Sequence, residues 1–198
     1  FSIILLLSYP LDLLVSSYLR KSNTFAFGEY STWNDLFEGK INADLVVYGS
    51  SRAWVNIDPA LLKDSLKMDS YNLGIDGHNF WLQNLRYREL LKHNKKPKYI
   101  IFSLDYFTLK KNKDLYNSEQ FLPYMLWNQE VEEATISYNG FSSLDYEIPL
   151  IRYYGNYDAV ETALRFSLGR LSNPITRVKG YMGRVEVWNS DFDKAKAS

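Results

Sequence analysis

Short apolar runs separated by helical patterns dominate the first hundred residues. Runs at 45–48 and 98–104 lack polar alternation, and a shorter run lies at 70–73. Continuous apolar runs are typical of strands covered on both faces, as in a parallel sheet. Between them, a capping pattern predicts a helix over 58–68, and apolar residues at helical spacings predict one over 79–94. Strands that alternate with helices predict right-handed crossovers and an α/β fold with a parallel sheet.

The helix over 79–94 has an amphipathic pattern. Its apolar residues are interrupted by charged ones, among them Arg86 and Glu89. We expect the apolar face to pack on the sheet and the charged residues to face solvent. The third run, 98–104, is expected to be a buried strand.

The alternation fades after residue 107, where helical patterns predominate. We expect helices over 118–134, 144–154 and 158–168, and irregular structure beyond residue 169. Tyrosine, phenylalanine and tryptophan are frequent in this part of the chain. The predicted helices form a helical insertion and C-terminal part, whose aromatic residues either pack together or form a lid over the strand ends.

The first 21 residues form a nearly continuous apolar run closed by Arg20 and Lys21. At about 1.5 Å per residue, a helix of this length spans the roughly 30 Å of a membrane core. Pro10 and Asp12 oppose a clean span, because a carboxylate near the centre of a membrane helix is costly. Three interpretations stay open: a membrane anchor, which we expect, a cleavable signal segment, or a buried helix of the folded domain.

The resulting plan has three parts. We expect a hydrophobic anchor helix over residues 1–21, a polar and aromatic connector over 22–43, and an α/β domain over 44–198. Phe1 at the start, and a last stretch without a terminating pattern, lead us to expect that both ends are cut.

The first apolar run stops at Gly49, followed by Ser50 and Ser51. A glycine there allows a sharp turn, and the run is predicted to be a central strand of the sheet. The two hydroxyls are therefore expected at the carboxyl end of that strand, where open α/β sheets bind their ligands.

These residues carry a resemblance to a known family. The segment 49–52, Gly-Ser-Ser-Arg, with Asp-Pro at 58–59 and Asn-Leu-Gly-Ile-Asp-Gly at 72–77, resembles the first two blocks of the SGNH/GDSL hydrolases. It is most similar to membrane-anchored members associated with the acylation of cell-envelope polysaccharides. The resemblance covers residues 44–105 and implies a three-layer αβα, flavodoxin-like fold. It also implies that Ser51 is the nucleophile and that the Gly77 amide binds the oxyanion.

The sequence departs from the family at the end of the third strand. The family carries a Gly-x-Asn-Asp block there, whereas this chain has Asp105 and no such asparagine. An ionised carboxylate would repel an oxyanion. Asp105 is therefore interpreted either as a helix cap or ion-pair partner, or as a site residue that orients substrate or a basic side chain.

The catalytic base is also missing from its usual place. The family takes it from an Asp-x-x-His motif, which does not occur in the 198 residues. His93, at a predicted helix end among lysines, is not expected to be catalytic. His78 follows Gly77 and is expected to contact substrate or to be an ordinary loop residue. Either the chain stops before the motif, or this is a degenerate, non-catalytic relative.

Two further assignments stay open at the first turn. Ser50 is a second candidate nucleophile, because a one-residue change in the turn would exchange the hydroxyl that faces the cleft. Arg52 is expected to contact substrate by holding an anionic acyl donor, or else to pair with an acidic neighbour.

Composition excludes several classes of function. Lys and Arg number 23, as do Asp and Glu, so no net field favours nucleic acid. There are no cysteines and two isolated histidines, which do not make a metal site. No Walker or dinucleotide-binding motif is present, and we expect no cofactor.

Two functions from different classes follow. The first is a membrane-tethered, extracytoplasmic esterase or O-acyltransferase that acts on acyl esters of a cell-envelope glycan through Ser51. The second is a non-catalytic module that uses the same cleft to bind a glycan or a partner. The expected partners are an acylated glycan or other acyl-ester substrate, which the resemblance implies, and the membrane, through the N-terminal helix.

Overall fold

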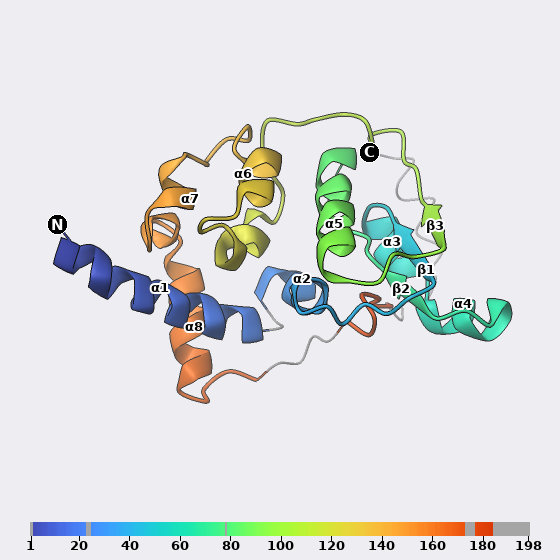
Figure 1. Ribbon diagram of the computed structural model, residues 1–198, viewed down its shortest axis with the longest axis horizontal. Helices are drawn as coiled ribbons and strands as arrows, with labels where there is room; N and C mark the ends of the chain where they lie inside the picture. The colour runs from blue at the N-terminus through green and yellow to red at the C-terminus, as the bar shows by residue number, and fades with distance from the viewer. Residues whose placement is uncertain (1, 23–24, 78, 173–176, 184–198) are drawn as a thin grey trace, which may run out of the picture.

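The computed structural model describes residues 2–22, 25–77, 79–172 and 177–183. At its centre is a three-stranded parallel sheet of order β2–β1–β3, with β1 (Leu45–Tyr48), β2 (Ser70–Asn72) and β3 (Tyr99–Phe102). Val46 of β1 lies opposite Tyr71 of β2 and Ile100 of β3. The predicted parallel α/β sheet is confirmed, and it lies at one end of the elongated molecule (Figure 1).

Two helices cover one face of the sheet. They are α3 (Ser51–Asn56) and α4 (Pro59–Leu66), which follow β1 directly. Leu45 and Val47 point to this side, where they form a small cluster with Ala53. Asp58 caps α4, since its carboxylate accepts a hydrogen bond from the Ala60 N–H at 2.8 Å, as its sequence predicts.

The other face of β1 packs on the main core. Val46 and Tyr48 join the larger apolar cluster, to which α2 (Glu29–Phe37) and α5 (Phe80–His93) contribute. Helices therefore lie on both faces of the central strand. The predicted connector over 22–43 contains the helix α2, whose side chains are partly buried in the core rather than exposed as in a polar linker.

The third strand is not the buried strand that its composition predicts. Tyr99 and Ile100 are 57% and 48% exposed, and Ile101 and Phe102 are partly buried. The reason is topological, because β3 is an edge of the sheet. The residues of β1, which have a strand on each side and helices above and below, are all buried.

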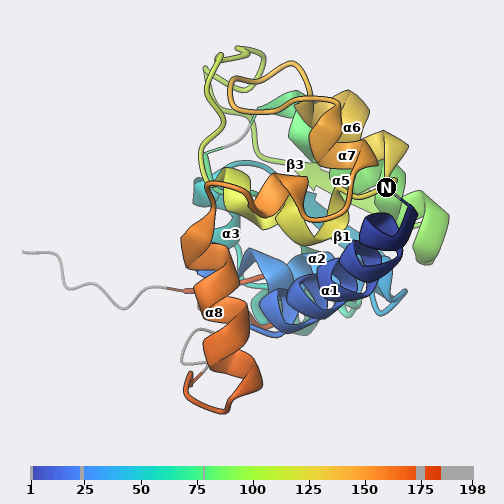
Figure 2. The same ribbon diagram turned by 90° about the vertical axis from the view of Figure 1, so that its left-hand side faces the viewer.

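The helical half of the molecule is organised around α1 (Ser2–Lys21). It crosses α8 (Tyr157–Ser167) and also contacts η2, a 3₁₀ helix over Ser118–Tyr124 (Figure 2). Asp12 is buried here. These are the contacts expected of a helix packed within the domain, one of the three interpretations of the segment.

The buried Asp12 is paired with Arg152. The guanidinium donates to both carboxylate oxygens, at 2.6 Å and 2.8 Å, and the Leu150 N–H donates to the same group at 2.7 Å. In the described part of the chain, no helix is long and apolar enough to cross a membrane. The membrane anchor and the extracytoplasmic location remain predictions.

The predicted helices between 118 and 154 are wrong as continuous elements. The first divides into η2, which contains Pro123, and α6 (Gln129–Thr135), separated by a left-handed residue at Trp127. The second divides into α7 (Leu144–Glu147) and η3 (Ile151–Tyr153). Between these two, Pro149 and the positive φ of Leu150 interrupt the helix. The helix predicted over 158–168 is confirmed as α8.

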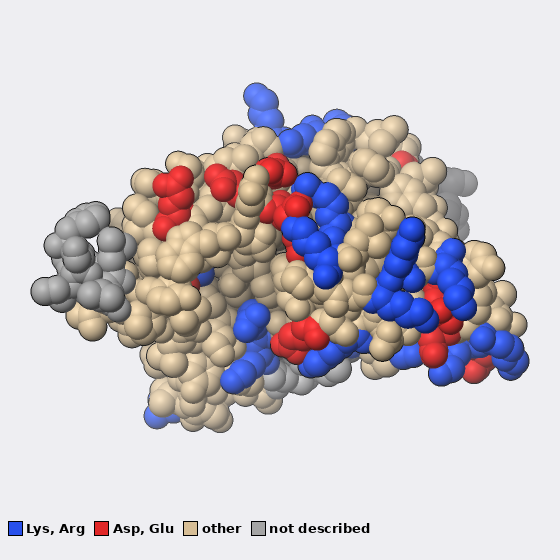
Figure 3. All heavy atoms as spheres, in the orientation of Figure 1, with Lys and Arg blue, Asp and Glu red and all other residues tan. Residues whose placement is uncertain are grey.

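Charged side chains of both signs share the face shown in Figure 3. Lysines and arginines gather over α5, β3 and α4, with acidic residues beside them. Several are paired, such as Lys92 with Glu130 at 2.7 Å and Lys95 with Asp44 at 2.9 Å.

Candidate active site

The turn after β1 has room only for glycine at position 49. Its φ is +154°, and a Cβ there would lie 2.7 Å from Ala53 Cβ and 2.8 Å from Ser103 Cβ. The chain can therefore pass between α3 and the end of β3 and enter α3 at once. As a result, Ser50 and Ser51 lie at the carboxyl end of the central strand.

Ser50 points inward. It is 2% exposed, and its hydroxyl donates a hydrogen bond to Oδ2 of Asp105. Ser50 Oγ also accepts a longer hydrogen bond of 3.4 Å from the Arg52 N–H, because Ser50 is the N-cap of α3. With its hydroxyl held in this way, Ser50 is the less accessible of the two serines.

Asp105 joins the ends of β1 and β3. Its side chain is 3% exposed, and Oδ1 lies 3.0 Å from Arg52 Nη1. Its own N–H donates to Thr108 Oγ1 at 2.8 Å, which fixes the turn after β3. The structure therefore makes Asp105 an ion-pair partner of Arg52, and Arg52 pairs with an acidic neighbour, one of its two predicted roles.

Ser51 faces a cavity of about 540 Å³. The helix α3 contributes most of the wall, and Asp76 and Tyr116 supply the opposite side. Ser51 is half-buried, so its side chain is neither enclosed in the core nor fully exposed. A hydroxyl in this position can meet a small ligand.

The loop after β2 borders the same cavity. Asp76 lines it, and Gly77 is exposed with a φ of +67°. A Cβ on Gly77 would lie 2.8 Å from Cδ1 of Tyr116, so the tyrosine ring packs against this residue. His78 lies outside the described residues. Ser51 and Asp76 thus border one cavity, and Gly77, the next residue along the chain, is not itself one of its lining residues.

A buried ion cluster holds this loop from below. Glu29 of α2 pairs with Arg86 of α5 and, at 2.7 Å, with Arg177, and all three side chains are fully buried. Arg86 also donates to the carbonyl oxygens of Leu73 and Gly74, at 3.2 Å and 2.8 Å. The guanidinium therefore fixes the backbone that leads from β2 to the cavity.

The cluster reaches the cavity in two more ways. The Asp76 N–H donates to Oε1 of Glu29 at 3.3 Å, and the Arg177 guanidinium lies over the ring of Trp54, 4.3 Å from its centre. Trp54 is one of the lining residues. Burial alone would raise the pKa of Glu29, but the charges of Arg177 and Arg86 outweigh it and lower that pKa to about 2. Glu29 is therefore ionised at neutral pH.

The described residues bring no histidine to Ser51. His93 lies at the far end of α5, where its Nε2 is 3.2 Å from Glu89 and its ring packs on Phe37. The described part of the chain also holds no group of three His, Cys, Asp or Glu side chains that could bind a metal ion. The side chains that line the cavity offer hydroxyls, one amide, the Asp76 carboxylate, the Arg52 guanidinium and aromatic rings.

The buried ion cluster and the position of Tyr116 at the cavity were not predicted from the sequence. Arg86 and Glu89 were expected to face solvent, yet they are 0% and 2% exposed. The charge pattern of α5 offered a signal, because both residues occur within the run of apolar positions. Nothing in the local sequence links Arg86 to Glu29, 57 positions earlier, or Tyr116 to the loop.

Comparisons with protein-family models, with curated proteins and with solved structures found no match. The resemblance to SGNH hydrolases therefore rests on the short motifs alone. Any conclusion about function has to rest on the geometry of the cavity.

Proposed function

We propose that the protein is an acyl-ester hydrolase or O-acyltransferase in which Ser51 is the nucleophile. The observation that carries the proposal is the difference in accessibility between the hydroxyls of the two adjacent serines. Ser50 is buried against Asp105, whereas Ser51 borders a cavity of about 540 Å³ at the carboxyl end of the central strand. That volume lies in the range of ordinary ligand sites, about 300–1,000 Å³.

The reaction proceeds through an acyl-serine. Ser51 Oγ attacks the ester carbonyl while a base takes its proton, and the Gly77 N–H donates to the oxyanion that forms. When the oxyanion collapses, the bond to the leaving alkoxide breaks, and that oxygen takes the proton from the base. Water or a second hydroxyl then attacks the acyl-serine by the same steps, which gives hydrolysis or transfer.

The proposal assigns the base to a histidine outside the described residues. His78 follows Gly77 in the sequence, and a later histidine in a longer chain would serve equally. Asp105 is a positioning residue, since it holds both Ser50 and Arg52. Arg52 keeps an exposed side chain at the cavity wall, where it can orient the acyl donor.

A second function is favoured by a specific observation. The described residues place no base beside Ser51, and the Asp105 carboxylate is already bound by Ser50 and Arg52. A cavity without a base can still bind a ligand. In this alternative the protein is a non-catalytic glycan- or partner-binding module.

Hydrolysis of a small acyl ester by the unsubstituted chain and by two variants separates these functions. Ser51→Ala should reduce turnover by at least about 10³, since it removes the nucleophile. Ser65→Ala, the same substitution on an exposed position of α4, should leave turnover unchanged. Turnover that survives Ser51→Ala would contradict the assignment of the nucleophile, and its absence from the unsubstituted full-length protein would favour the binding module.

His78→Ala then locates the base. Loss of turnover comparable to that of Ser51→Ala would identify His78. Retention of turnover would exclude His78 as the base.

A further inference from the structure

A second cavity of about 540 Å³ lies in the helical half, where η1 (Phe25–Gly28), the start of η2 and the start of α8 meet. Aromatic residues form much of its wall. They are Phe25, Phe27, Tyr116 and Tyr157. Three of these rings are largely exposed, at 51% for Phe27, 54% for Tyr116 and 67% for Tyr157. Exposed aromatic rings gathered at a hollow indicate a ligand or partner that covers them.

Polar side chains complete the wall. They are two amides, Asn117 and Asn156, and two carboxylates, Glu119 and Asp158. Among the described lining residues there is no lysine or arginine. Amides donate and accept hydrogen bonds, and carboxylates accept them. The wall therefore suits a ligand that carries several hydroxyls and no negative charge.

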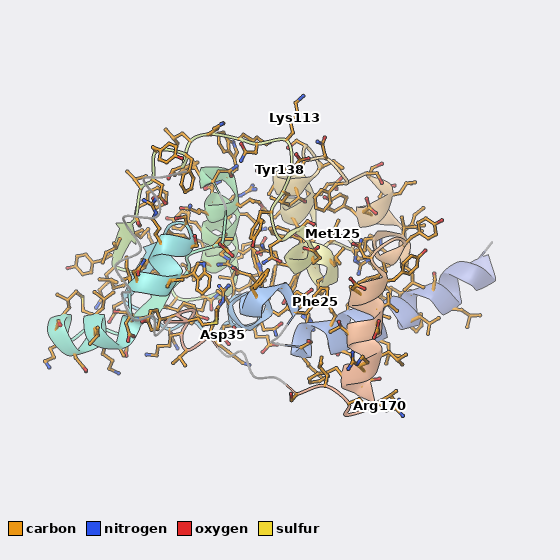
Figure 4. The ribbon with its side chains drawn as sticks, turned by 180° about the vertical axis from the view of Figure 1, so that it is seen from behind. Phe25, Asp35, Lys113, Met125, Tyr138 and Arg170 are labelled. Atoms are coloured by element: carbon orange, nitrogen blue, oxygen red, sulfur yellow. The ribbon has the colours of Figure 1, made fainter. Side chains whose placement is uncertain are left out.

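The backbone of this wall is held in an uncommon conformation. Ala26, Phe27 and Asn117 all have a φ of about 52°, in the left-handed region that side chains rarely adopt. Two contacts maintain it, because Asn117 Nδ2 donates to the Ala26 carbonyl at 3.2 Å and Arg177 Nη2 to the Phe27 carbonyl at 3.0 Å. Such backbone is found at functional sites more often than elsewhere. Phe25, which precedes Ala26 in this wall, is labelled between α2 and α8 in Figure 4.

The second cavity adjoins the Ser51 cavity. Tyr116 lines both, so the two cavities share one wall residue. Glu119 and Asn156 also line a third cavity of about 240 Å³. The second cavity therefore shares lining residues with each of the other two.

We infer that the aromatic cavity binds sugar units of an uncharged glycan chain that extends past Tyr116 toward Ser51. A sugar ring has apolar C–H faces, which stack on aromatic rings, and a rim of hydroxyls, which bind amides and carboxylates. The lining offers both, and cavities that share wall residues suit a chain of sugar units better than a single unit. The inference depends on the proposed function only for the position of the acyl ester at Ser51, and sugar binding is independent of it.

Two other classes of ligand fit less well. An acidic glycan or a phosphate would meet Glu119 and Asp158 with no described cation in the wall to offset them. A purely apolar ligand would cover the carboxylates of Glu119 and Asp158 without donating a hydrogen bond to them, which is unfavourable. An uncharged polyhydroxyl ligand avoids both costs.

Binding is tested with the Ser51→Ala chain, so that no ester chemistry interferes. The probes are hexamers of glucose, mannose, galactose and N-acetylglucosamine, with a galacturonate hexamer as the acidic comparison, measured by calorimetry. At least one uncharged hexamer should bind, at least tenfold tighter than its disaccharide, and the galacturonate hexamer should not. The inference is overturned if no uncharged hexamer binds, if the acidic hexamer binds as well, or if the disaccharide binds as tightly.

The aromatic wall is tested by Tyr157→Ala in the same background. Its affinity for the hexamer should fall at least tenfold, and an unchanged affinity would overturn the inference. Tyr99→Ala, which removes a similarly exposed ring from the edge strand β3, should leave affinity unchanged. Glu119→Gln, which is isosteric, should weaken hexamer binding because it removes a charged acceptor. It provides a second test of the wall if Tyr157→Ala does not fold. Hydrolysis of a small ester by Tyr157→Ala with Ser51 intact should be unchanged, which separates a failed sugar site from a failed Ser51 mechanism.

Discussion

The sheet half and the helical half each bury a carboxylate bound by arginine, but the two contacts hold different things. Glu29, on α2, takes part in a cluster that binds the backbone of a loop. Asp12, on α1, takes part in one that binds helices to each other. A buried ion pair is weak evidence of net stabilisation, because desolvation offsets the attraction. The two halves therefore differ in the part of the structure that each buried carboxylate holds in place.

In the sheet half, the geometry that is fixed belongs to the candidate site. Arg86 binds the carbonyl oxygens of Leu73 and Gly74, and Glu29 accepts from the Asp76 N–H. These are the residues that carry the chain from β2 to the Ser51 cavity. A change in this cluster should therefore alter both stability and reactivity.

In the helical half, the fixed geometry is the position of α1. Arg152 donates to Asp12, to Ser16 Oγ at 3.1 Å and to the Leu122 carbonyl. Ser16 in turn lies 2.8 Å from the hydroxyl of Tyr153. None of these groups lines the Ser51 cavity, so a change here should alter stability alone.

The largest effect is expected from Glu29→Gln. It leaves two buried guanidinium groups without their carboxylate, and breaking a buried pair typically costs about 3–5 kcal/mol. We expect the free energy of unfolding in urea to fall by about 5 kcal/mol, and ester turnover per folded molecule to fall as well. Glu161→Gln, in an exposed pair with Arg165 on α8, should change stability by less than about 0.5 kcal/mol. A similar small change for Glu29→Gln would contradict the role of the cluster.

A somewhat smaller effect is expected from Asp12→Asn. One arginine loses its partner, and the unfolding free energy should fall by about 3 kcal/mol. Ester turnover, corrected for the folded fraction, should be unchanged, because the cluster does not touch the Ser51 cavity. A loss of turnover in the folded protein would mean that the two halves are coupled.

The smallest and most specific effect is a dependence on pH. The pKa of Glu29 lies at about 2 in the folded chain against an ordinary value of 4.5, so its ionised form stabilises the folded state. That contribution, about 3 kcal/mol by linkage, is fully present above pH 4.5 and is lost as the pH falls toward 2. Unfolding free energies at pH 6 and pH 3 should therefore differ more for the unsubstituted chain than for Glu29→Gln. Equal differences would show that Glu29 does not titrate in this way.

The sheet half could be predicted from the sequence because its signals are local. An apolar run that ends in Gly49, a cap at Asp58 and an apolar spacing over α5 each act within a few residues. Adjacent strands and short crossovers then leave few topologies. The edge position of β3 was missed, since composition does not say which strand lies outermost.

The helical half resisted prediction because its determinants are distant or conformational. Asp12 opposes a membrane span in the sequence, and its partner in the fold, Arg152, lies 140 residues away in the chain. Left-handed residues at Trp127 and Leu150 break helices that apolar spacing alone predicts. At the candidate site, the turn and both serines followed from the motif, whereas the inward direction of Ser50 depends on its contact with Asp105.

The difference between the two serines is tested most directly by covalent labelling. The chain is treated with a fluorophosphonate, and the adduct is located by mass spectrometry of its peptides. We predict phosphonylation of Ser51 and none of Ser50, and we predict no adduct on the peptide that carries these positions in the Ser51→Ala chain. An adduct on Ser50, or no adduct on either serine in the folded chain, would contradict the assignment of the nucleophile.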